Sequence, residues 1–195
     1  RGSRGREIYQ GIQEILQTPV GEAYRQAVER NAQLISSLPE DIRAHVNEMI
    51  SDRVLKGYRP EDIAGLVERF LPEEVKTRSM LIARTESAKA HTELTRARAQ
   101  AVRMNWYMWH STHDSRTRPS HRKMDGVICS WDDPPSPEAL NNEKSYGRYP
   151  PGGIWNCRCY PEPINPDMIA AQLGSGPFRV YRNGQIRTMT LNWKG

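Results

Sequence analysis

The sequence has few of the features that stabilise secreted or membrane proteins. Its 195 residues contain three cysteines, Cys129, Cys157 and Cys159. An odd number at this spacing is a poor disulfide framework, so we expect a reducing compartment. No apolar run approaches the roughly 18 residues of a membrane span, and we expect no membrane contact. No signal peptide is visible, but the chain begins at Arg1 without methionine. A missing upstream segment or a tag remnant would each explain this start, so the absence of a signal peptide is weak evidence about the compartment.

The composition is also short of apolar residues and of strong net charge. Hydrophobic residues make up 37% and charged residues 26% of the chain, which predicts a modest core in one domain, with or without a helical extension. The net charge of +5 is compatible with contact to DNA or to an acidic protein surface. It does not establish either, because such attraction is screened within about 8 Å at physiological salt.

The first half of the sequence has the periodicity of helices. Thr18 and Pro19 are suited to a helix start, and Gly57 is suited to a helix end. Pro60 opens a short apolar-striped helix, and Pro72 opens the longest one, which we expect to run to about Met104. The apolar stripes are most simply explained by core packing.

The second half is rich in proline, so its strands must be short and irregular. The sequence predicts strands at residues 106–110 and 155–160, a short helix over 166–173, and a hairpin with strands at 178–181 and 186–191 around Asn183-Gly184. The expected fold class is α+β. A helical N-terminal half with one long helix precedes a small, irregular, coil-rich domain that contains β-structure, and a C-terminal hairpin follows.

Two polar clusters could be joined by charge. One is on the long helix, and the other is in a polar loop, from Asp114 to Gly126, that follows the aromatic strand predicted at residues 106–110. Arginine binds carboxylates through two nitrogens, and a buried arginine requires such a partner. We therefore predict that the two clusters form one partly buried network; the alternatives are a solvated helix face and a solvated basic turn. Its members are Arg84, Glu86, Asp114, Arg116 and Arg118.

The Cys157-Arg158-Cys159 segment indicates a third cluster. Residues two apart on a strand point to the same side, so both thiols could bind one ion, and Cys with a nearby His suits Zn²⁺. The candidate ligands are Cys157, Cys159 and His121, with His113, Cys129 or water as the fourth. The alternative needs no metal: the cysteines are small core residues, and Trp109, Trp131 and Trp155 pack around the loop.

Taken in order, these clusters resemble the phage Mu F-like family, also called the head-morphogenesis or minor capsid family. The resemblance covers roughly residues 55 to 162. Family members often have His-Pro before the Asn-Cys-Arg-Cys segment, where this chain has Ile154-Trp155, so a metal ligand from that His is not available. The segments that carry the resemblance are Ala83-Arg84-Thr85-Glu86, Trp109, Asp114-Ser115-Arg116-Thr117-Arg118, His121, Asp125-Gly126, Pro150-Pro151-Gly152 and Asn156-Cys157-Arg158-Cys159.

The resemblance implies a minor component of the phage head, associated with the portal or the capsid interior, that acts in head assembly or in DNA packaging or delivery. It implies portal and capsid proteins as partners, with DNA as a further candidate, and a location in the virion, with the host cytoplasm during assembly. It also divides the chain into a helical extension (1–56), the Mu F-like domain (57–163) and a C-terminal helix and hairpin (164–195).

Two other function classes remain open, an enzyme of one of two kinds and a DNA-binding module. A metal-dependent nuclease would use His113, Asp114 and His121, but the sequence shows no clear paired-carboxylate spacing. An ADP-ribosyltransferase-like enzyme would use Arg84 on a dinucleotide phosphate, but no Glu-x-Glu lies near the end of the chain. A DNA-binding module fits the many Arg and Trp residues, although acidic residues are interleaved with the basic ones.

Overall fold

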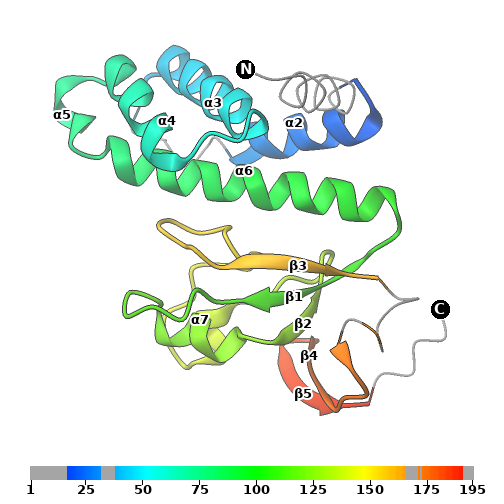
Figure 1. The fold of residues 1–195 in the computed structure, drawn as a ribbon. Coiled ribbons are helices and arrows are strands. Elements are labelled where there is room, and N and C mark those ends of the chain that lie inside the picture. The colour runs from blue at the N-terminus through cyan, green and yellow to red at the C-terminus, as the bar shows by residue number, and fades with distance from the viewer. Residues whose placement is uncertain (1–16, 32–37, 166–170, 172, 191–195) are drawn as a thin grey trace. The chain divides into compact units, whose positions relative to one another are not determined.

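The structure, a computed structural model, describes residues 17–31, 38–165, 171 and 173–190. The chain divides into two compact units, residues 1–97 and residues 98–195. The first unit is helical and the second contains a five-stranded sheet, which confirms the α+β class (Figure 1). The predicted division at residues 56 and 163 is a different partition and stays a prediction. Among the described residues, no helix is both long and apolar enough to cross a membrane.

Helices form the N-terminal unit. They pack around a core of aliphatic side chains, as the apolar stripes predicted. Val46, Ile50, Ile63 and Val67 are almost fully buried in this core. The elements are α2 (Pro19–Asn31), α3 (Glu40–Leu55), α4 (Pro60–Val67), the 3₁₀ turn η2 (Glu68–Phe70), α5 (Glu73–Lys76) and α6 (Ser79–Ala101), whose last turn belongs to the second unit.

The end of α3 was correctly predicted at Gly57. The Gly57 N–H donates to the Val54 carbonyl, and the Tyr58 N–H donates to the Arg53 carbonyl. These two bonds make a Schellman cap, in which one residue must take a left-handed backbone conformation. Gly57 has a φ of 75° and adopts that conformation without a steric penalty. Pro60 then occupies the first position of α4.

The predicted single helix from Pro72 to Met104 is wrong at both ends. It is interrupted by a turn at Thr77 and Arg78, which separates α5 from α6, and α6 stops at Ala101. The Arg78 carbonyl accepts the Ile82 N–H and so begins a new helix. Thr77 and Ser79 flank this start, and both residue types have lower helix propensity than Ala or Leu.

One mixed sheet organises the C-terminal unit. Its strand order is β3-β1-β2-β4-β5, and only the β2–β4 pair is parallel. The C-terminal hairpin is therefore part of the same sheet as the aromatic strand. The strands are β1 (Trp106–His110), β2 (Val127–Ser130), β3 (Tyr160–Ile164), β4 (Phe178–Arg182) and β5 (Gln185–Met189).

The β1 strand was correctly predicted, but the one expected at 155–160 was not. That segment is a loop, and the strand begins only at Tyr160. β3 contains Pro161 and Pro163, which cannot donate backbone hydrogen bonds; it tolerates them because it lies at the edge of the sheet. Most of the helix predicted over 166–173 lies outside the described residues.

The hairpin around Asn183-Gly184 was also correctly predicted. Arg182 pairs with Gln185, so the turn has two residues. Asn183 has a φ of 50° and Gly184 a φ of 80°, the signs required by a type I′ turn. This turn matches the twist of the flanking strands, which is why Asn-Gly is effective there.

Aromatic side chains dominate the core of the C-terminal unit. Trp109 and Trp131 are fully buried, and Tyr107 packs on Trp131 with ring centroids 4.3 Å apart. Trp155, which the metal-free alternative placed in this packing, is instead 44% exposed. Two short helices lie along the chain between the strands, α7 (Pro119–Met124) and α8 (Pro137–Leu140). The segment expected to be a polar loop up to Asp125 thus contains a helix, and that helix positions the candidate site.

Candidate functional site

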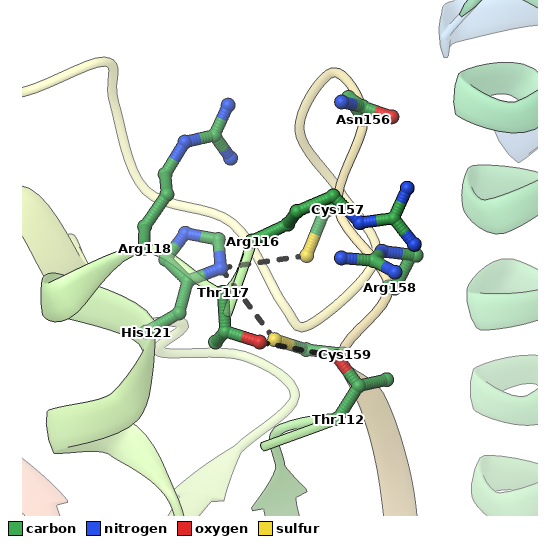
Figure 2. A pocket seen from close by; sticks show the side chains of 9 residues that line it. All are labelled: Thr112, Arg116, Thr117, Arg118, His121, Asn156, Cys157, Arg158 and Cys159. Carbon is green, nitrogen blue, oxygen red and sulfur yellow. Dashed lines mark hydrogen bonds between the residues drawn. The ribbon is translucent and has the colours of Figure 1, made fainter. Parts of the chain in front are cut away.

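Three segments bring the candidate ligands together. α7 carries His121, whose side chain points into the protein and is 1% exposed. The loop before β3 carries Cys157 and Cys159. In this loop Asn156 has a φ of 53°, and the Cys157 N–H donates to the Ile154 carbonyl. This tight turn, rather than a strand, directs both thiols toward α7 (Figure 2).

The geometry of the cluster is compact. The His121 Nδ1 atom lies 3.5 Å from the Cys157 Sγ and 3.5 Å from the Cys159 Sγ. The three ligand atoms lie within 4.8 Å of one another, and all three residues are buried. In the part of the chain that the structure describes, this is the one group of three or more His, Cys, Asp or Glu side chains arranged to hold a metal ion.

A second set of buried groups lies behind the imidazole. The His121 Nε2 atom is 3.2 Å from the Tyr149 hydroxyl oxygen and 3.5 Å from Glu138 Oε1. The Tyr149 hydroxyl donates to the same Glu138 oxygen at 2.5 Å. Glu138 is 1% exposed, and its Oε2 atom has no hydrogen-bond partner. A carboxylate on this side favours the tautomer with the proton on Nε2, which leaves the Nδ1 lone pair facing the sulfurs.

The two thiols have unequal proton affinities. A hydrogen bond from Cys159 lowers the pKa of Cys157 against the effect of burial, and His121 lowers it further. The same bond, together with burial, raises the pKa of Cys159. Cys129 lies elsewhere in the core, where burial raises its pKa to about 12. The lowered pKa favours the thiolate form of Cys157, and thiolate is the form of cysteine that binds metals.

A cavity of about 160 Å³ opens beside the ligands. Its wall includes all three ligand residues and the side chains of Arg116, Arg118 and Arg158 (Figure 2). The remaining lining residues are polar: Thr112, Thr117 and Asn156. The position next to the cluster is thus accessible to a small polar or anionic group.

Arg158 is a site residue that the sequence reasoning did not assign. Its guanidinium contacts both carboxylate oxygens of Asp114, with Nη2 to Oδ1 at 2.8 Å. Burial would raise the pKa of Asp114, but hydrogen bonds from Thr117, the Arg116 N–H and Arg158 outweigh it and lower that pKa. The available signal was the position of Arg158 between the two cysteines, in the segment that carries the family resemblance.

The members of the predicted charge network have partners within their own units. Arg84 Nη2 lies 4.0 Å from Glu61 Oε1, and Glu86 forms a buried ion pair with Lys89 at 2.8 Å. Arg118 donates to the Trp155 carbonyl. The Arg116 backbone N–H donates to Asp114. The predicted contact of Arg84 and Glu86 with the loop stays a prediction.

The other predicted metal ligands are outside the cluster. His113 Nε2 lies 3.1 Å from Asp125 Oδ2, and Cys129 contacts the Val127 carbonyl. The three residues considered for a nuclease likewise take separate partners, since His121 faces the sulfurs and Asp114 binds Arg158. Among the described residues, the three-membered ligand set is His121, Cys157 and Cys159.

The fold and the site together define a small α+β protein with a buried His-Cys-Cys cluster beside an arginine-lined cavity. The sequence model described as "Phage Mu protein F like protein" matches residues 44–161. That is more than half of the chain, so the chain belongs to this family of phage head morphogenesis proteins, as the resemblance indicated.

One curated relative is an uncharacterized protein of Haemophilus influenzae. It is 31% identical over 134 residues, which cover 69% of this chain. The chain spans about 28% of the length of that relative. No solved structure shows a significant match.

Proposed function

We propose that the chain is a minor head protein of a tailed phage that binds the portal or the capsid and acts during head assembly or DNA packaging and delivery. One observation carries the proposal. The family match spans residues 44–161 and thus includes part of the helical unit and the whole His-Cys-Cys cluster. The head morphogenesis assignment therefore applies to the part of the chain that contains the candidate site.

A partly exposed cluster on the C-terminal unit is the surface we assign to a head-protein partner. It consists of Tyr146, Trp155 and Arg118. Tyr146 is 50% exposed and Trp155 44% exposed, and their rings meet edge to face at 4.7 Å. The Arg118 guanidinium lies over the Trp155 ring at 5.5 Å. Tyr, Trp and Arg are the residues most enriched among those that dominate protein–protein binding energy. We call this cluster the aromatic patch.

The first test removes the protein from the phage or prophage that encodes it. We expect capsid shells to assemble while the number of infectious particles falls. Purified heads that contain the chain, identified by mass spectrometry and then located by imaging at the portal vertex, would establish its place in the virion. Particles made without it that are normal in number, DNA content and infectivity would contradict the proposal.

The second test addresses the aromatic patch. Trp155→Ala should reduce incorporation of the chain into heads, because Trp155 is its most central side chain. Tyr160→Ala is the matched control. Tyr160 is also exposed, at 54%, but it stacks on His110 outside the patch. Equal incorporation of the Trp155 and Tyr160 variants would exclude the patch as the contact surface. Contact with packaged DNA would appear instead as a change in DNA content at normal incorporation.

A further inference from the structure

We propose that His121 Nδ1, Cys157 Sγ and Cys159 Sγ bind one Zn²⁺ ion, with a fourth coordination position that opens onto the arginine-lined cavity. This proposal does not depend on which head protein the chain binds. Three features support it: the spacing of the ligand atoms, the groups behind the imidazole, and the way the site joins separated segments of the C-terminal unit.

The spacing matches tetrahedral zinc coordination. Zn–S bonds of about 2.3 Å and Zn–N bonds of about 2.0–2.1 Å at tetrahedral angles place sulfur and nitrogen about 3.6 Å apart. Both sulfurs lie 3.5 Å from the His121 Nδ1 atom. A neutral imidazole nitrogen has one lone pair and accepts one good hydrogen bond. Two thiols at the same distance therefore cannot both donate to Nδ1, and without a metal Cys159 donates to Cys157 instead. One cation between the three atoms would bind all of them and accounts for the equal distances.

The groups behind His121 form the outer shell usual for a zinc-bound histidine. Such a histidine almost always donates its other N–H to a carboxylate, a carbonyl or water, which fixes the tautomer and raises the basicity of the ligand. Here Glu138 and the Tyr149 hydroxyl surround Nε2. Glu138 is buried and has an unpartnered oxygen, so a nearby cation would also offset the energetic cost of its charge.

The ligands join parts of the chain that are far apart in sequence. Cys157 and Cys159 lie 36 and 38 residues after His121. The chain between them forms β2, α8 and long coil segments. Two thiolates neutralise the charge of Zn²⁺, and soft sulfur ligands favour zinc over Mg²⁺ or Ca²⁺. The fourth position borders the cavity and takes solvent, since His113 and Cys129 have other partners.

The main rival is a Cys157–His121 nucleophilic pair oriented by Glu138. Such a pair needs one thiolate, and Cys159 would act in it only as a hydrogen-bond donor to Cys157, which does not require both sulfurs to lie at the same distance from Nδ1. The two possibilities differ in a measurable way. A zinc site binds metal and protects both thiols, whereas a nucleophilic pair reacts rapidly with an alkylating reagent when no metal is present.

The experiment uses the full chain, purified under reducing conditions without a metal-affinity tag. Elemental analysis should give about one zinc per chain. Exchange with Co²⁺ should produce the thiolate charge-transfer band and the intense visible bands of a tetrahedral site. The zinc content of the Cys157→Ser variant and of the Cys159→Ser variant should fall below a tenth of an equivalent per chain. Cys129→Ala, the matched control at a buried cysteine outside the cluster, should keep the full zinc content.

Tyr149→Phe tests the outer shell. It should weaken zinc binding 10- to 100-fold in a competition with a chelator, because loss of such a partner typically has that effect. The zinc content at saturation should not change. If the cysteine variants do not fold, the test is made on the wild-type protein. A chelator should then remove the zinc and lower the unfolding midpoint of the wild-type chain.

Three results would overturn the proposal. One is folded wild-type protein with less than a tenth of an equivalent of zinc and no Co²⁺ bands. Another is full zinc content in the Cys157→Ser variant, which would place the metal elsewhere. The third is rapid alkylation of Cys157 that depends on His121 in protein that takes up no metal, which would identify the nucleophilic pair.

Discussion

Arg158 binds both carboxylate oxygens of Asp114, a residue 44 positions earlier in the chain. This pair joins the loop that follows β1 to the loop that carries Cys157 and Cys159. The Arg122 side chain adds hydrogen bonds to the carbonyls of Asp114 and Ser115. The position of the cysteine loop therefore depends on a charged contact as well as on the cluster itself.

We predict that Arg158→Met lowers the unfolding midpoint of the chain and loosens the cysteine loop. Methionine keeps most of the apolar stem but removes the two-point contact with Asp114. Arg116→Met is the control, because the structure shows Arg116 bound to Asp114 through its backbone N–H and not through its side chain. Thermal unfolding followed by circular dichroism measures both variants. Equal midpoints would show that the Asp114–Arg158 pair adds nothing to stability.

The same carboxylate should make stability depend on pH. The hydrogen bonds from Thr117, Arg116 and Arg158 outweigh burial, so the pKa of Asp114 in the folded chain lies below its ordinary value of 3.8. The folded chain therefore binds this proton less readily than the unfolded chain. The stabilisation is present above pH 3.8 and is lost as the pH falls through the lowered pKa. Asp114→Asn should flatten the acid side of the curve of midpoint against pH, and an unchanged slope would contradict this.

The sequence indicated which residues come together at the site, but it did not indicate the local structure that holds them. Cys157, Cys159 and His121 could be grouped because two thiols two residues apart and a nearby imidazole suit one metal. The expected reason, a strand that points both side chains one way, was wrong. The turn depends on a positive φ at Asn156, and α7 depends on packing that no short-range pattern reveals. Glu138 and Tyr149 were missed because only the folded chain brings them to His121.

The fold was predictable where local signals are strong. Pro19, Gly57 and Asn183-Gly184 each impose a backbone conformation, and the structure has a helix start, a helix end and a turn at these places. β2 was not predicted, because Val127–Ser130 is a four-residue strand whose pairing with β1 and β4 is non-local. The break at Thr77 and Arg78 was missed because the apolar spacing continues across it.

Two glycines give a matched test of backbone conformation. Apart from the adjoining backbone, no atom lies within 4 Å of a Cβ added to either Gly184 or Gly65, but Gly184 has a φ of +80° whereas Gly65 lies in α4. We expect Gly184→Ala to destabilise the chain by about 1–2 kcal/mol, the penalty of a left-handed backbone for a residue with a Cβ. Gly65→Ala should stabilise it by about 0.5–1 kcal/mol. Urea unfolding of both variants measures the difference, and changes of the same sign would refute the argument.

The Glu86–Lys89 pair is unusual because both side chains are almost fully buried. Their exposed fractions are 7% and 4%, and Lys89 Nζ donates to Glu86 Oε1 at 2.8 Å. Burial raises the pKa of Glu86, and the attraction of Lys89 only partly opposes this rise. The charged form of Glu86 would therefore be unfavourable in this buried position without Lys89. Arg25–Glu22, another pair on a helix, is exposed, with side-chain exposed fractions of 53% and 61%.

We expect the loss of one partner to be far more damaging than the loss of both. Glu86→Gln leaves the Lys89 charge buried without a counterion and should destabilise the chain by about 3–5 kcal/mol. The double variant Glu86→Leu/Lys89→Met removes both charges at similar volume and should restore most of that loss, because apolar replacements of buried pairs are often neutral. Arg25→Ala is the exposed control and should change stability by less than about 1 kcal/mol. Urea unfolding of the three variants and of the wild-type chain measures these changes in stability. If Glu86→Gln proves as mild as Arg25→Ala, the pair is solvated in solution, and its burial does not limit the stability of α6.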